Sequence, residues 1–284
     1  MSLVTLKEVL QEAERGGYAV GAFNTNNMEI LQAIMETAEE ERAPVILQAS
    51  QGAIKYAGLP YITAMVRAAA AAATVPVVLH LDHGTSFEQA MLCLRHGFTS
   101  VMFDGSKYAL ADNIAQTQRV AEVAHAMGVS VEGELGKIGG TEDDISVDER
   151  DAFFTDPAEA EQFVAATGVD ALAVAIGTAH GPYKGEPSLD FDRLAAIRDR
   201  VQVPLVLHGA SGVPAESIRR AISLGVRKIN IDTDIRQAFA RAVKQVLQDS
   251  PAEYDPRKIL GPAKAAMKEV IREKIRLFGS AGKA

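Results

Sequence analysis

The stretch Pro76–Gly84 reads PVVLHLDHG, an apolar run that ends in residue types able to bind metals. Further along, Pro204–Gly209 reads PLVLHG and repeats the same order of residue types. A near-continuous apolar run of this length is typical of a parallel strand that is buried on both faces. The similarity is too short to prove an internal duplication, but it indicates one architecture that recurs along the chain.

Runs of this kind occur eight times, and helical patterns separate them. Eight strand–helix units in one chain favour a closed (β/α)8 TIM barrel over an open sheet. The predicted strands are Tyr18–Asn24, Pro44–Ser50, Pro76–Asp82, Ser100–Gly105, Ser130–Leu135, Ala171–Gly177, Pro204–Gly209 and Lys228–Thr233. The predicted helices include Met28–Glu41, Phe87–Arg95, Asn113–Met127, Pro157–Thr167 and Glu216–Leu224.

The length of 284 residues suits one barrel domain, which we expect to span residues 1–284. Thr5–Arg15 is predicted as an extra helix before the barrel, and Lys258–Phe278 as a helical extension after it. Two long segments rich in Gly, Pro and charge, Gly136–Arg150 and Ala179–Leu189, are expected to be irregular. Both follow the carboxyl ends of strands, where barrel enzymes carry their chemistry.

Composition excludes several classes of protein. A net charge of −8 argues against general nucleic-acid binding, although a pocket can still be locally positive. The apolar runs are shorter than the about 18 residues that span a bilayer, and the N-terminus lacks a signal-peptide pattern. Cys93 is the single cysteine, which excludes an internal disulfide and fits a reducing compartment. We therefore expect a cytoplasmic protein.

Three of the six histidines, His83, His180 and His208, lie at or just past the ends of separate predicted strands. A single histidine at such a place is more often a buried core residue than a ligand. Strand ends of a barrel converge on one mouth, however, and three imidazoles with an open fourth position describe a catalytic zinc site. The others are interpreted as a core residue and two helix-end residues, namely His80, His96 and His125.

Acidic residues gather at the same expected face. Asp82 precedes His83, Asp104 ends a strand, and Glu132 and Glu134 alternate so that both face one side. A carboxylate inside a barrel is costly unless it is paired or binds a metal, so either a structural or a metal-binding role is open. The loop Gly139–Asp144, GGTEDD, is either functional or a solvated turn.

Glycine-rich or short polar turns follow the seventh and eighth strands. The stretch His208–Gly212 reads HGASG, and Asn230–Thr233 reads NIDT before a helix. Loops at these positions frequently bind phosphate in this fold, because backbone N–H groups and a helix N-terminus favour an anion. Such turns can also be ordinary helix starts, so alone they are weak indications.

The combination of these motifs resembles class II fructose-bisphosphate aldolases and their tagatose-bisphosphate relatives. The resemblance covers essentially the whole chain. The matching segments are Gly17–Asn24 (GYAVGAFN), His80–Gly84 (HLDHG), Ser130–Gly136 (SVEGELG), Gly139–Asp144 (GGTEDD), Gly177–Lys184 (GTAHGPYK), Leu207–Gly212 (LHGASG) and Lys228–Asp234 (KINIDTD).

The resemblance implies a role for each matching residue. It implies zinc on His83, His180 and His208, Asp82 as the acid/base at the aldehyde-derived hydroxyl, and Glu142 as the base that deprotonates dihydroxyacetone phosphate. A second metal position is implied at Asp104 and Glu134, together with a monovalent cation (Na⁺ or K⁺) near the phosphate loops. The implied substrate contacts are Asn24, Ser50, Gly181, Gly209, Ala210, Ser211, Asn230, Ile231, Asp232 and Thr233.

Chemistry requires such residue types. Cleavage of a carbon–carbon bond beside a carbonyl leaves an enediolate, whose charge needs either a lysine imine or a Lewis acid. The nearest lysine for an imine is Lys228, which opens the eighth predicted strand, and the zinc mechanism is the stronger prediction. A metal-dependent hydrolase is the first alternative, but the first strand lacks the His-x-His that such barrels often carry. A non-catalytic barrel that binds sugar phosphates is the second.

The run Asn230–Arg236 predicts a preference for fructose over tagatose bisphosphate. Tagatose-specific relatives tend to carry a small residue where this chain has Asp232. Arg236 falls in the first turn of the next helix, where a guanidinium is unfavourable for the helix dipole unless it serves a phosphate. Its other interpretation is a surface ion pair with Asp232 or Asp234. The resemblance also implies glycolysis and gluconeogenesis as the setting and a homodimer or homotetramer as the assembly.

Overall fold

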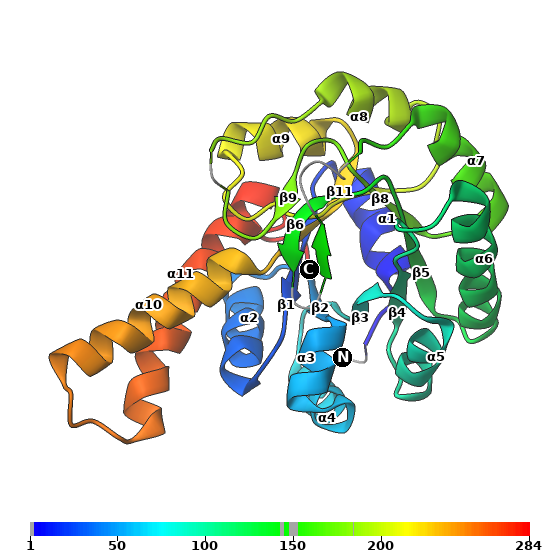
Figure 1. Cartoon of the computed structure of the whole chain (residues 1–284). Helices are drawn as coiled ribbons and strands as arrows, with labels where there is room; N and C mark the ends of the chain where they lie inside the picture. Colours follow the sequence, from blue (N-terminus) through cyan, green and yellow to red (C-terminus); the bar gives the residue numbers. More distant parts are fainter. Residues whose placement is uncertain (1–2, 143–144, 148–152, 184) are drawn as a thin grey trace.

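Eight parallel strands close a barrel in the computed structural model, which describes residues 3–142, 145–147, 153–183 and 185–284 (Figure 1). The strand order around the barrel is β1-β11-β10-β8-β5-β4-β3-β2. Every residue of these strands is buried, which explains their near-continuous apolar sequences. The bounds are Val20–Asn24 (β1), Val45–Ala49 (β2), Val77–Gly84 (β3), Ser100–Phe103 (β4), Ser130–Leu135 (β5), Ala171–Val174 (β8), Leu205–Leu207 (β10) and Val226–Ile231 (β11).

All eight predicted strands are therefore confirmed, and helices cover the outside of the barrel (Figure 1). Helices between the strands were expected from the eight strand–helix units, but no bounds were predicted for Gln51–Ala57 (α3), Leu59–Ala72 (α4) and Phe191–Arg198 (α8). The helices are Leu6–Gly16 (α1), Met28–Glu41 (α2), Gln51–Ala57 (α3), Leu59–Ala72 (α4), Phe87–Arg95 (α5), Leu110–Ala126 (α6), Pro157–Thr167 (α7), Phe191–Arg198 (α8), Ala215–Ser223 (α9), Thr233–Asp249 (α10) and Pro256–Phe278 (α11).

The extra N-terminal helix is α1, and it begins with a capping box in which Thr5 and Glu8 satisfy each other's backbone N–H groups. Its apolar face carries Leu6 and Leu10, both fully buried. These side chains pack with inward-facing barrel residues such as Val78 and Val206 in a separate core cluster. Because α1 covers one end of the barrel in this way, the functional groups are left to the other end.

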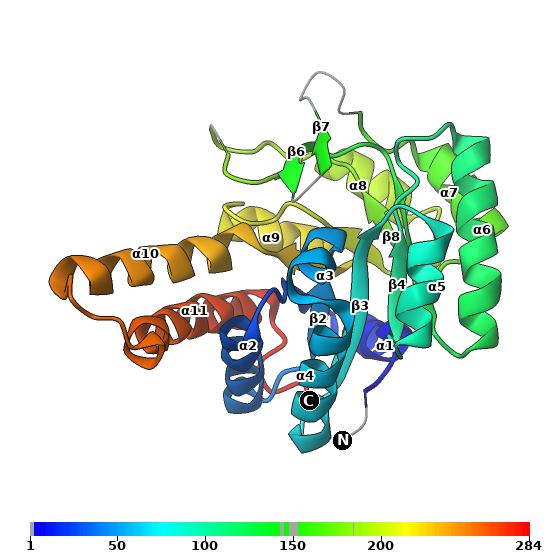
Figure 2. The same ribbon diagram turned by 60° about the horizontal axis from the view of Figure 1, so that its bottom comes forward.

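The C-terminal extension is α11, which runs beside α10 and packs against α2. Figures 1 and 2 both show α10 and α11 side by side, extending away from the barrel as an arm. Glutamates on α2 form ion pairs with basic residues of α11, for example Glu36 with Lys264 at 2.7 Å. The base of the arm is therefore fastened to the first helix after β1.

The prediction that Gly136–Arg150 is irregular was wrong for part of the segment. Strands β6 (Gly139–Glu142) and β7 (Ile145–Val147) form an antiparallel hairpin, and β6 also pairs in parallel with β9 (Ala179–His180). This hairpin stands beyond the end of the barrel (Figure 2). A short strand that is held by backbone hydrogen bonds does not need alternating apolar and polar side chains. The sequence pattern therefore did not indicate this hairpin. Residues 143–144 and 148–150 of the predicted loop lie outside the described residues.

Cys93 lies on α5 and is fully buried in the main core. Burial raises the pKa of its thiol to about 12. Among the described residues, none of the helices combines the length and the apolar character that crossing a membrane would require.

Candidate metal and phosphate site

Three histidines converge at the carboxyl ends of the strands. His83 lies on β3, His180 lies on β9, and His208 directly follows β10. Their ring centroids are 4.7 Å apart for His83 and His208, 5.1 Å for His83 and His180, and 6.1 Å for His180 and His208. One ring nitrogen from each lies within 4.8 Å of the other two. The spacing is that of a group able to hold one metal ion.

Two buried carboxylates beside this cluster fix how the rings face. His83 Nδ1 lies 3.0 Å from Asp104 Oδ2, and His208 Nε2 lies 2.9 Å from Glu132 Oε1. When each of these nitrogens donates its proton to the carboxylate, the other nitrogen of the ring keeps a lone pair. Those two nitrogens, His83 Nε2 and His208 Nδ1, face each other at 3.0 Å. Two lone pairs at this distance repel unless a proton or a metal cation lies between them, and with His180 beside them the three residues can hold a metal.

Glu132 is itself held by a buried charge. Lys228 Nζ lies 2.9 Å from Glu132 Oε2, and both side chains are fully buried. Burial alone would raise the pKa of Glu132, but the Lys228 charge and the hydrogen bond from His208 hold that pKa well below its usual range. Lys228, the nearest imine candidate, therefore serves as the counter-ion of a carboxylate.

Burial lowers the pKa of His208 to about 4, although the bond to Glu132 opposes this shift. The ring is therefore neutral at pH 7, as a metal ligand must be. His80 faces the barrel interior as expected, with Nδ1 2.8 Å from Ser100 Oγ and Nε2 3.5 Å from Glu132. It lies behind the histidine cluster.

Asp104 and Glu134 form a second potential metal group together with His83, again with ligand atoms within 4.8 Å. Burial raises the pKa of Glu134 well above its usual range, and the Asp104 charge adds to this shift. Asp104 is also buried, but its hydrogen bond with His83 holds its pKa below the usual range. One proton or one cation beside these two acids would relieve their repulsion.

Asp82 is fully buried and surrounded by amide donors. Its Oδ2 accepts from Asn24 Nδ2 and from Gln48 Nε2, each at 3.1 Å, and its Oδ1 accepts from Asn230 Nδ2 at 3.2 Å. Gln48 Nε2 also donates to Asn24 Oδ1 at 2.6 Å. Sequence reasoning did not identify Gln48 as a functional residue. The only indication in the sequence was a polar amide side chain within the otherwise apolar run of β2.

His83 has a backbone φ of +46°, a left-handed conformation that side chains rarely adopt. The pairing of β3 with β4 shifts register between Leu81 and Gly84, which spans this residue. Gln51 Nε2 donates to the carbonyl of His83 at 2.7 Å and so braces the unusual turn. Backbone strain of this kind is characteristic of functional positions, where it aims a side chain that a regular strand would point elsewhere.

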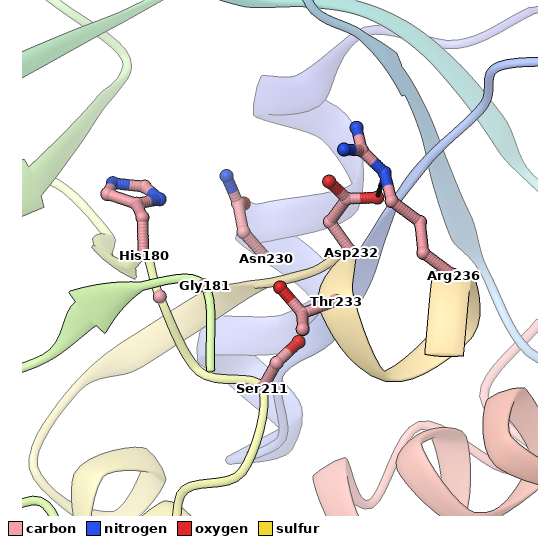
Figure 3. Close-up of a pocket in the computed structure, with 8 residues that line it drawn as sticks. His180, Gly181, Ser211, Asn230, Asp232, Thr233 and Arg236 are labelled. Atoms are coloured by element: carbon pink, nitrogen blue, oxygen red, sulfur yellow. Dashed lines mark ion pairs between the residues drawn. The ribbon is translucent and has the colours of Figure 1, made fainter. Parts of the chain in front are cut away.

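A pocket beside the histidines collects most of the expected phosphate residues (Figure 3). Its lining consists of His180, Gly181, Gly209, Ser211, Asn230, Asp232, Thr233 and Arg236. Thr233 begins α10, and Ser211 Oγ accepts a hydrogen bond from Asp234 N at 3.3 Å, so both residues lie at a helix N-terminus, which favours an anion (Figure 3).

Four expected substrate residues are not among those that line this pocket. Ala210 and Ile231 are buried in the main core, so only their backbone could reach a ligand. Ser50 caps α3 by accepting a hydrogen bond from Ala53 N at 3.2 Å. Asn24 contacts Asp82 instead. Glu142 ends β6, and its side chain is outside the described part of the structure.

Arg236 forms an ion pair with Asp232, with Nε 2.7 Å from Oδ1 (Figure 3). This is the surface pairing that the sequence left open as an alternative. The Arg236 side chain is nevertheless 39% exposed and lines the pocket, so its guanidinium borders the space that an anion would occupy. Arg236 can therefore form the ion pair with Asp232 and still contact an anion in the pocket.

A (β/α)8 barrel whose strand ends carry a histidine cluster, a caged carboxylate and an anion pocket defines a metal-dependent barrel enzyme. The family model described as "Fructose-bisphosphate aldolase class-II" matches residues 4–283, and the chain belongs to this family. Members are lyases, and zinc dependence is a property of the family.

Relatives match over nearly their whole length. The fructose-bisphosphate aldolase of Thermus caldophilus is 52% identical over 305 residues, covering 99% of this chain and all of that protein. The fructose-bisphosphate aldolase of Geobacillus stearothermophilus is also 52% identical and covers 100% and 99% of the two chains. The crystal structure of the YdjI aldolase from Escherichia coli K12 is 38% identical, with a TM-score of 0.87 and 99% of each chain covered.

Proposed function

We propose that this chain reversibly cleaves fructose 1,6-bisphosphate into dihydroxyacetone phosphate and glyceraldehyde 3-phosphate, with glycolysis and gluconeogenesis as its setting. The observation that carries the proposal is the convergence of His83, His180 and His208, of which one ring nitrogen each lies within 4.8 Å of the other two, beside the buried carboxylate of Asp82. The full-length similarity to enzymes named fructose-bisphosphate aldolase supports the choice of substrate.

In this proposal His83, His180 and His208 hold zinc. A zinc ion there would act as a Lewis acid. It would stabilise the enediolate, whose negative charge develops on the former carbonyl oxygen when the carbon–carbon bond breaks. Asp82 takes the proton from the hydroxyl at C4, which allows the bond to break. The amides of Asn24, Gln48 and Asn230 hold the Asp82 carboxylate in place by donating to both of its oxygens.

The other roles follow the family resemblance. Glu142 moves the proton at the dihydroxyacetone phosphate carbon; it ends β6, two residues after Gly140, which pairs with His180. The pocket at Ser211 and Thr233 binds the phosphate of the ketose half, with the ion pair of Asp232 and Arg236 at its border. Backbone groups of Gly181, Gly209, Ala210 and Ile231 would complete that phosphate site.

Several finer assignments complete the proposal. Asp104 and Glu134 provide the alternative metal position, and a monovalent cation, Na⁺ or K⁺, accompanies the phosphate. Ser50 and Asn24 support the substrate. The protein acts as a homodimer or homotetramer in the cytoplasm. Asp232 favours fructose over tagatose bisphosphate, because tagatose-specific relatives tend to have a small residue at this position.

Turnover of fructose 1,6-bisphosphate by the purified protein tests the proposal. We expect about one tightly held zinc per chain by metal analysis, loss of cleavage on exhaustive chelation, and recovery when zinc is added back. Borohydride with substrate should not inactivate the enzyme, since Lys228 is paired with Glu132 and no imine forms. Full activity of the metal-free protein would refute the zinc mechanism, and borohydride inactivation would reassign it to a lysine.

A further inference from the structure

Tyr183 joins the two backbone segments that carry His180 and His208. Its hydroxyl accepts a hydrogen bond from Ala179 N and donates one to the carbonyl of Gly209, each at 2.8 Å. Ala179 directly precedes His180, and Gly209 directly follows His208. One phenol oxygen therefore links the immediate neighbours of two histidines in the cluster.

The backbones around this link are in direct contact. A Cβ built on Gly209 would lie only 2.5 Å from Ala179 O, and one built on Gly140 would lie 2.2 Å from His180 O. Strand β9 is therefore packed between β6 and the loop after β10, with no room for a side chain at either contact. Figure 1 shows β6 and β9 side by side. Hydrogen bonds, rather than interlocking side chains, must fix the position of β9 along its neighbours.

On one side these bonds are the β6–β9 ladder, which pairs Gly139 with Ala179 and Gly140 with His180. On the other side the Tyr183 hydroxyl makes the link to Gly209. Burial raises the pKa of Tyr183, so the phenol keeps its proton and its capacity to donate. A ladder of two residue pairs is short, and a second attachment is needed to resist sliding.

We propose that Tyr183 is a positioning residue that holds β9 in register, so that His180 faces His83 and His208. The inference rests on the proposed metal site. It connects three functional parts through one short strand: the hairpin that carries Glu142, the ligand His180, and the Gly209–Ser211 phosphate turn. Without the phenol oxygen, β9 stays paired with β6 but loses its fixed distance to the loop after β10.

The variant Tyr183→Phe tests this inference, because it removes one oxygen and keeps the ring that packs against the core. Zinc affinity is measured by competition with a chelator, without any need for turnover. We expect zinc binding to weaken about 10–100-fold, the usual effect of losing an outer-shell partner. The visible spectrum of the cobalt-substituted protein should shift, since it reports on ligand geometry. The Tm of the metal-free protein should stay within about 2 °C of the parent.

Two further variants separate the possible failures. Tyr254→Phe makes the same chemical change at a tyrosine that is 90% exposed, and should match the parent in every measurement. If His180→Ala leaves zinc affinity unchanged, the proposed metal site is wrong. If His180→Ala weakens zinc binding but Tyr183→Phe leaves affinity and spectrum as in the parent, the metal site stands and the role of Tyr183 is refuted. If the Tm of the metal-free Tyr183→Phe variant is far below that of the metal-free parent, Tyr183 stabilises the fold and the positioning role is refuted.

Discussion

Asp232 and Arg236 both line the pocket and form an ion pair with each other at its border. The ion pair with Arg236 holds the carboxylate at the pocket border, while Thr233 and Ser211 offer donors to an anion in the same pocket. A carboxylate at this border would repel a phosphate but can accept a hydrogen bond from a sugar hydroxyl. It is therefore suited to recognise configuration, and Arg236 is suited to bind phosphate.

Fructose and tagatose bisphosphates differ in configuration at C4, so Asp232→Ala should narrow the preference for fructose bisphosphate. We expect a change of about tenfold in the ratio of kcat/KM values, comparable to one lost charged hydrogen bond of about 1.5 kcal/mol. Arg236→Ala should mainly raise KM. Asp234→Ala is the matched control, since Asp234 pairs with Lys274 at 2.7 Å. A parent enzyme that already cleaves tagatose bisphosphate more efficiently would contradict the assignment.

Single residues of the site differ in how well the sequence predicts them. His83, His180 and His208 were predicted together because barrel topology brings strand ends to one mouth. Gln48 and Tyr183 were missed, because their partners lie on other elements and only the three-dimensional pairing gives them a role. Lys228 was considered only as a nucleophile, although its distance to Glu132 makes it a counter-ion.

At the scale of elements, buried parallel strands were the easiest to predict, because burial on both faces leaves an uninterrupted apolar run. The bounds of α4 were not predicted, since its Ala-rich sequence gives a weak contrast between its two faces. The β6–β7 hairpin was missed because Gly139–Glu142 pairs through its backbone. Backbone pairing leaves little trace in side-chain patterning.

The ion pairs between α2 and α11 predict how stability depends on pH. Glu40 and Glu41 contact Lys268, Arg272 and Arg276, and hydrogen bonds from these cations lower the pKa of both acids. A folded-state pKa below the unfolded value contributes stability above the unfolded pKa, near 4.3, and the contribution is lost as pH falls through the folded pKa. This network should therefore be stabilising at pH 7 and ineffective in strong acid.

The double variant Glu40→Gln/Glu41→Gln removes these charges. Its Tm should be about 2 °C below that of the parent at pH 7, with the gap shrinking below about pH 4 and in high salt. Glu273→Gln, at an exposed position on α11, is the control and should show no such gap. A Tm difference that persists unchanged into acid would mean that packing, not charge, joins the two helices.

At the scale of the whole molecule, both ends of the described chain are fastened to the barrel. Val4 N donates to Val77 O at 2.9 Å at the start of β3, and Gly282 N donates to Glu41 O at 2.8 Å at the end of α2. The last helix thus returns to the first helix after β1. Within the described residues, this closure of the chain favours one unit over two separable parts.

We propose accordingly that residues 1–284 form a single domain, and we expect one cooperative unfolding transition. Calorimetry and far-UV circular dichroism should give coincident transitions for the metal-loaded protein. Two resolved transitions, with the arm of α10 and α11 melting first, would show that the arm is a separate unit. Zinc should raise the midpoint in a concentration-dependent manner, because only the folded chain assembles the histidine cluster.

The burial of Cys93 has a consequence for oxidative stress. Peroxides and disulfides react with the thiolate form of cysteine, and burial raises the pKa of the Cys93 thiol to about 12, so the thiol stays protonated at neutral pH. The chain has no second cysteine with which a disulfide could form. An oxidant therefore finds no reactive thiol in this protein, and oxidation would act on other groups, such as the methionine thioethers, rather than on a cysteine.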